Sequence, residues 1–135
     1  MTAFAHRHLP QAPDVLAPDG SEVRILLAFE QQGSMAHFRL PAGAVAKAVV
    51  HASVQELWYV LEGRGQMWRR QGEGEHAREE VLALEPGLCL SIPVGTRFQF
   101  RAALDAPLSA VAITLPPWPG ADEAQFVQGP WVASV

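Results

Sequence analysis

The sequence contains a single cysteine, Cys89, among its 135 residues. No internal disulfide can therefore form, and we expect a reducing, cytoplasmic location for the protein. Cys89 stands in the apolar run LCLSI, which is typical of a buried and unreactive thiol.

Charged residues make up only 18% of the chain, the net charge is −4, and no long lysine or arginine run occurs. This charge distribution predicts neither nucleic acid nor an anionic membrane as a partner.

Long hydrophobic runs and helical periodicity are also missing. No apolar stretch approaches the ~20 residues that a membrane-spanning helix needs. The beginning of the chain has neither the basic start nor the apolar stretch of a signal peptide. A single domain is expected from the length.

Short apolar and β-branched runs are present instead, and glycine and proline separate them. This pattern predicts an all-β barrel or sandwich. The polar residues 71–80 are expected to form an exposed loop. The expected strands are Glu22–Phe29, Ser34–Leu40, Ala44–His51, Glu56–Leu61, Arg64–Arg70, Val81–Leu84, Leu88–Ile92, Arg97–Ala102 and Leu108–Leu115.

Two segments combine glycine, proline, histidine and glutamate at regular spacing. Residues 43–63 read GAVAKAVVHASVQELWYVLEG, and residues 87–102 read GLCLSIPVGTRFQFRA. They resemble the paired signatures of the cupin superfamily, G-x5-H-x-H-x3-4-E-x6-G and G-x5-P-x-G-x2-H-x3-N. The resemblance implies an all-β double-stranded β-helix, or jelly-roll barrel, with little helix.

The resemblance also divides the chain. The barrel is expected to span residues 22–115, after an N-terminal arm at residues 1–21. Residues 116–135 are rich in proline and are expected to form a tail. We expect this tail to pack on the barrel because it contains Trp118, Phe126 and Trp131.

In cupins, two histidines and a glutamate of the first motif and a histidine of the second hold a divalent metal ion. Only His51 and Glu56 match these positions, whereas Val49 and Phe98 stand at the other two. Two protein ligands make a poor site, because even catalytic zinc normally has three. We therefore expect no metal cofactor, with a divalent transition metal as the alternative.

Side chains alternate across a strand, and the resemblance indicates which face of each strand lies inside the barrel. The inner faces are expected to surround a cavity that binds a ligand. No catalytic residue is assigned. The expected ligand-binding residues are Lys47, His51, Glu56, Trp58, Phe98 and Phe100.

Three functions are compatible with these residues. The favoured one is binding, without metal, of a small, partly apolar organic molecule that carries an acidic or hydroxyl group. The second is a metal-independent sugar-modifying enzyme, of the isomerase or epimerase kind, that uses His51 and Glu56 as an acid–base pair. The third is a metallo-cupin with an atypical ligand set. Alternatively, the polar residues only form hydrogen bonds or ion pairs with one another in the core and have no ligand.

The segment Glu56–Leu61 is apolar on both of its expected faces. Leu57, Tyr59 and Leu61 would point outward, where a soluble monomer rarely leaves a large apolar patch uncovered. We therefore expect a homodimer. The alternative is that the C-terminal tail covers this row.

Overall fold

The computed structural model describes residues 1–135 and consists of two antiparallel β-sheets. In order of pairing, the six-stranded sheet comprises β1 (Val15–Leu16), β2 (Glu22–Phe29), β3 (Gly33–Leu40), β10 (Leu108–Leu115), β5 (Gln55–Glu62) and β8 (Cys89–Ile92). The five-stranded sheet comprises β11 (Ala124–Phe126), β4 (Val49–His51), β9 (Arg97–Ala102), β6 (Gly65–Gln71) and β7 (Arg78–Leu84). Two short 3-10 helices, η1 (Gly74–His76) and η2 (Ala121–Glu123), are the only helices. The expected all-β architecture with little helix is confirmed.

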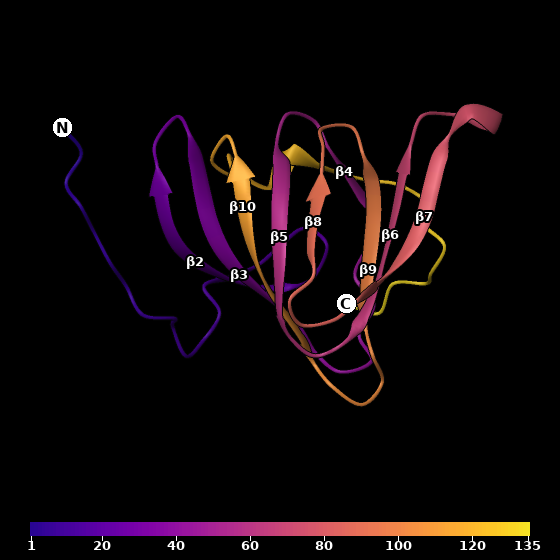
Figure 1. The fold of residues 1–135 in the computed structure, drawn as a ribbon, viewed down its shortest axis with the longest axis horizontal. Helices are drawn as coiled ribbons and strands as arrows, with labels where there is room; N and C mark the ends of the chain where they lie inside the picture. The colour runs from indigo at the N-terminus through magenta and orange to yellow at the C-terminus, as the bar shows by residue number, and fades with distance from the viewer.

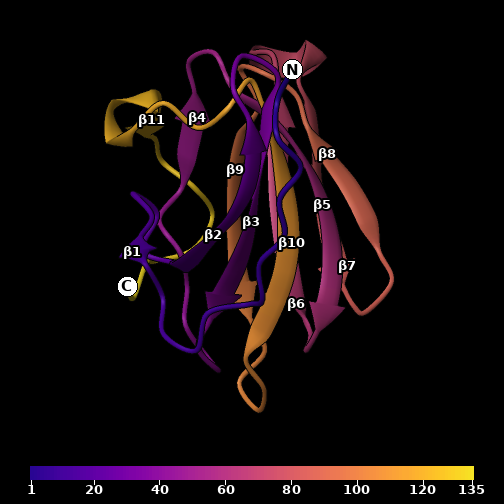
Figure 2. The same ribbon diagram turned by 90° about the vertical axis from the view of Figure 1, so that its left-hand side faces the viewer.

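The two sheets face each other as layers of a jelly roll. In Figure 1, β2, β3, β10, β5 and β8 of the larger sheet lie on the left and in the centre, and β9, β6 and β7 of the smaller sheet lie on the right. In the turned view, β3 and β10 lie in front of β9 and β6 (Figure 2). The N-terminal residues extend away from the sheets (Figure 1). No helix has the length and apolar character that crossing a membrane requires.

The hydrophobic core fills the space between the layers, and the pleat of β5 shows how it forms. Glu56, Trp58 and Val60 are buried, while the residues between them are exposed. This two-residue period is the one expected for a strand with one face against the core. The Trp58 ring stacks on Phe38 at 5.6 Å and meets the edge of Phe100 at 5.0 Å.

The glycine that ends the first sequence motif has a specific structural role. Gly63, in the turn between β5 and β6, has φ of 82°, a conformation that side chains rarely tolerate. A Cβ atom there would lie 1.9 Å from the carbonyl oxygen of Pro107. The turn therefore requires glycine for two independent reasons.

Two of the expected strands have limits that differ by more than one residue from those observed. The segment 44–51 forms a strand only at Val49–His51, preceded by an isolated bridge between Val45 and Arg101. Strand β7 begins at Arg78, inside the expected loop, because its polar residues pair with β6. Arg69 forms an ion pair with Glu80 there, in the same way as Arg70 does with Glu79.

The C-terminal residues pack on the smaller sheet. Strand β11 pairs with β4, and the buried side chain of Gln99 binds the residues that follow. Its Nε2 donates to the carbonyls of Ala46 (2.8 Å) and Trp131 (2.9 Å), while its Oε1 accepts from the Trp131 amide. The Arg101 guanidinium lies over the Trp131 ring at 4.1 Å.

The outer face of the larger sheet is not covered by this tail. Leu57, Tyr59 and Leu61 are 51%, 48% and 40% exposed, so the alternative of a tail over this row is wrong. Leu57 pairs with Ile113, which pairs in turn with Met35, so the apolar row crosses three strands.

Cys89 corrects a further expectation. Its side chain is exposed, because β8 alternates and directs Leu90 and Ile92 inward instead.

Candidate functional site

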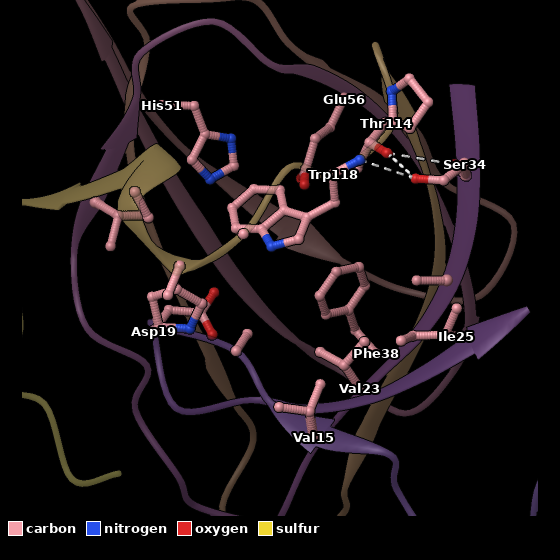
Figure 3. Close-up of a pocket in the computed structure, with 18 of the residues that line it drawn as sticks. Val15, Asp19, Val23, Ile25, Ser34, Phe38, His51, Glu56, Thr114 and Trp118 are labelled. Carbon is pink, nitrogen blue, oxygen red and sulfur yellow. Dashed lines mark hydrogen bonds between the residues drawn. The ribbon is translucent and has the colours of Figure 1, made fainter. Parts of the chain in front are cut away.

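A cavity of about 460 Å³ opens between the two sheets. Most of the side chains around it are apolar. Its polar groups come from segments far apart in the sequence, as Figure 3 shows. They are Asp19, Ser34, His51, Glu56 and Thr114.

Glu56 is a buried acidic group of the cavity, with only 4% of its surface exposed. The strand period places Trp58 on the same face, and its indole Nε1 donates to Glu56 Oε2 at 2.7 Å. The other carboxyl oxygen makes no hydrogen bond to the protein. Burial raises the pKa of Glu56 from 4.5 to about 7, and the charge of Asp19 acts in the same direction. Glu56 therefore exists in both protonation states near neutral pH.

His51 ends strand β4 and is 6% exposed. Its ring meets the edges of Phe98 at 5.2 Å and Trp118 at 5.1 Å. The buried Nδ1 atom has no hydrogen-bond partner. Burial lowers the pKa of His51, so the imidazole is neutral at pH 7.

Asp19 contributes a second carboxyl group from the segment before β2. Its Oδ1 accepts hydrogen bonds from the backbone amide (2.9 Å) and hydroxyl (2.7 Å) of Ser21. Burial raises the pKa of Asp19, although these hydrogen bonds oppose the rise. Sequence reasoning missed this residue because it lay in the expected arm. The only local signal was Asp-Gly-Ser, which favours a turn closed by the aspartate side chain.

Trp118 forms part of the cavity wall from the segment after β10. Its backbone amide donates to the hydroxyl of Ser34 at 3.2 Å, and that hydroxyl also bonds Thr114. The indole extends from there into the cavity beside His51 (Figure 3). Trp118 was expected as an anchor of the tail, and its position in the cavity follows only from the fold.

Four of the six expected ligand-binding residues line the cavity, namely His51, Glu56, Trp58 and Phe98. Lys47 does not, and its placement is corrected. Its backbone amide donates to the Asp19 carbonyl, while its ammonium donates to the carbonyl of Val135. The reason is a break in the alternation: Ala46 and Ala48 are buried, but so is Val49. Counting every second residue back from His51 therefore assigns Lys47 to the wrong face.

Phe100 is the second corrected placement. It is 2% exposed and packs against the Trp58 ring, one layer deeper in the core than the cavity wall. Its inward direction agrees with the strand period of β9. Trp58 thus separates Phe100 from the cavity.

The residues at the metal-ligand positions of the cupin motif have a defined geometry. Val49 and Phe98 are direct partners across β4 and β9, and both are almost fully buried. Only His51 and Glu56 offer donor atoms there, and one Glu56 oxygen is bonded to Trp58. No group of three His, Cys, Asp or Glu side chains is close enough to share an ion. This donor set does not fit the three or more protein ligands of a typical metal site.

The cavity therefore combines aromatic walls with two carboxyl groups and a neutral imidazole, all largely withdrawn from water. Such a site can bind a hydrogen-bonding ligand. It can also exchange a proton with one, because the pKa of Glu56 is close to neutral.

Comparison with solved structures shows the same fold at low identity. Pac13 of Streptomyces, solved with uridine, is 12% identical with a TM-score of 0.66, and the match covers 95% of this chain and 93% of Pac13. Pac13 is described as a nucleoside dehydratase. The capsular polysaccharide assembling protein CapF of Staphylococcus aureus is 14% identical with a TM-score of 0.66. That match covers 81% of this chain but only 32% of CapF.

A third structure, Drosophila melanogaster CENP-C bound to CAL1, is 18% identical with a TM-score of 0.61 and 71% coverage of both chains. No curated protein sequence gives a significant match. The family model described as "Cupin domain" matches residues 36–114, which include both sequence motifs and most of the strands of the barrel. The chain therefore belongs to the cupin family.

Proposed function

We propose that this protein binds a small, largely apolar organic molecule in the barrel cavity without a metal ion. The observation that carries the proposal is the cavity itself, a space of about 460 Å³ whose mostly apolar wall contains the side chains of Asp19, His51 and Glu56. Sites for small molecules typically combine such an apolar space with a few polar groups. Two proteins that share this fold were solved with small molecules, Pac13 with uridine and CapF with a tropolone inhibitor, which supports a small molecule as the ligand.

The arrangement of the polar groups also supports binding over simple core filling. If His51 and Glu56 only satisfied each other, they would share a hydrogen bond. Instead Glu56 accepts from Trp58, and Nδ1 of His51 is left without a partner. Buried polar atoms without partners cost stability, so a retained function is the simpler explanation.

Metal-independent acid–base catalysis is the second candidate. Its specific support is the pKa of Glu56, about 7, beside a neutral imidazole. These are the protonation states that a general acid and a general base need near neutral pH. Conversion of the bound molecule by the wild-type protein, with loss of turnover in Glu56→Gln and retained binding, would distinguish an enzyme from a binding protein.

The binding proposal is tested by blocking the cavity. Ala36 lines it and is small, so Ala36→Phe should fill part of the space. Ala83 is exposed on β7, and Ala83→Phe is the matched control. Ligand-observed NMR with neutral, cationic and anionic aromatic fragments should detect binding to the wild type and to Ala83→Phe, but not to Ala36→Phe.

Far-UV circular dichroism checks that both variants are folded. Binding that is equal in all three proteins, or no binding of any fragment class, would contradict the proposal.

A further inference from the structure

We propose that the ligand of this cavity is an organic cation, with an amine or ammonium group attached to an apolar body. The inference rests on the proposed function and specifies its ligand class. It follows from the charges, the free hydrogen-bonding atoms and the aromatic walls of the cavity.

The charges around the cavity have one sign. Asp19 and Glu56 are its only two acidic groups, and no lysine or arginine lines it. The expectation of an acidic ligand depended on Lys47, which the structure places outside the wall with its ammonium on the Val135 carbonyl. An anionic ligand would meet two carboxyl groups and no counter-charge. A cationic ligand would provide the counter-charge that these groups lack.

Each of the two carboxyl groups has one oxygen fixed by the protein and one free. Trp58 holds Oε2 of Glu56, and Ser21 holds Oδ1 of Asp19. The remaining oxygens, Oε1 and Oδ2, have no donor in the protein. Asp19 and Glu56 are 92% and 96% buried, so water solvates these oxygens poorly. A ligand N–H or an ammonium charge would satisfy them directly.

The apolar part of the wall also suits a cation. The aromatic rings of Phe38, Trp58, Phe98 and Trp118 line the same cavity as the carboxyl groups. Figure 3 labels Phe38 and Trp118 among them. Aromatic faces attract cations through their quadrupole, and the attraction grows when water is excluded. The same rings can contact the apolar body of the ligand.

Binding of such a cation should depend on pH. The ionised form of Glu56 attracts the ligand, and the pKa of this carboxyl is about 7. The charged or titratable groups that act on it or near it are Asp19 and His51, with Lys47 beside Asp19 and Glu123 beside His51. An alkylamine stays protonated over the neutral range. Its affinity should therefore rise with pH and level off above the pKa of Glu56.

The test uses probes of similar size that differ in charge: 2-phenylethylamine, 2-phenylethanol and phenylacetate, together with the corresponding naphthyl series. Isothermal titration calorimetry compares them at about pH 8.5, where Glu56 is ionised. The amine should bind about tenfold or more tightly than the alcohol, and the acid should bind least. At about pH 5.5 the affinity for the amine should fall by about tenfold or more, toward that of the alcohol, since Glu56 is then protonated.

Two variants complete the test. Glu56→Gln should remove the preference for the amine and its pH dependence, while the alcohol still binds. Glu75→Gln changes an exposed acid far from the cavity lining and should leave both unchanged. An alcohol that binds as tightly as its amine at about pH 8.5 would overturn the cation proposal and leave the binding function standing. Absence of binding in both series would overturn the binding function itself.

Discussion

The substitution Glu56→Gln provides a direct test of the buried carboxyl group. Glutamine has nearly the same shape as protonated glutamate, and its amide oxygen can still accept the Trp58 indole N–H. The substitution therefore removes the ionisation and keeps the packing. In the wild type, burial holds the pKa of Glu56 at about 7 instead of 4.5. The folded protein thus binds this proton more tightly than the unfolded chain does.

The sign of the effect follows from this difference. Below pH 4.5, Glu56 is protonated in both states and does not affect the free energy of unfolding. As the pH rises from 4.5 to about 7, the unfolded chain releases the proton first, so the wild type loses stability. The difference between the two pKa values corresponds to about 3 kcal/mol. We expect Glu56→Gln to match the wild type at low pH and to be more stable by about 3 kcal/mol above pH 8.

Urea unfolding followed by tryptophan fluorescence, at several pH values between about 4.5 and 8.5, measures this difference. In thermal unfolding it should appear as a rise in Tm of roughly 10 °C at the highest pH. Asp19 and His51 also titrate with altered pKa values, but they are present in both proteins and largely cancel in the comparison. A stability difference that does not change with pH, or a variant that is less stable at high pH, would refute the reasoning.

Three further substitutions test other parts of the structure. Gln99→Leu should lower the free energy of unfolding by about 2 kcal/mol, because it leaves backbone groups of the core and tail without partners, and urea unfolding would show it. The wild type should sediment as a homodimer that pairs through the exposed apolar row of the larger sheet. Leu57→Arg should make it monomeric, whereas the control Val81→Arg should leave it dimeric. A monomeric wild type would contradict the dimer. Val49→His combined with Phe98→His should create zinc affinity measurable by calorimetry, since these cross-strand partners would join His51; no gain would contradict the correspondence with the metal positions.

The sequence alone determined the architecture, because that information is local. Strand alternation placed Glu56 and Trp58 on the same face of β5, and the cupin resemblance indicated that this face is the inner one, as the structure has it. The spacing of glycine and proline in the two motifs matched the turns of the barrel, with Gly63 in a position that only glycine fits. Within one continuous strand, the period of two fixes which residues share a face.

Only the tertiary structure decided which side chains meet in the cavity. The alternation changes phase between Ala48 and Val49, so no pattern in the sequence could place Lys47 outside the wall. Asp19 and Trp118 reach the cavity from segments that flank the barrel in the sequence, and their approach depends on how those segments fold back over it. Periodicity describes a residue's direction relative to its own strand, whereas the composition and the charge of a cavity depend on contacts between segments distant along the chain.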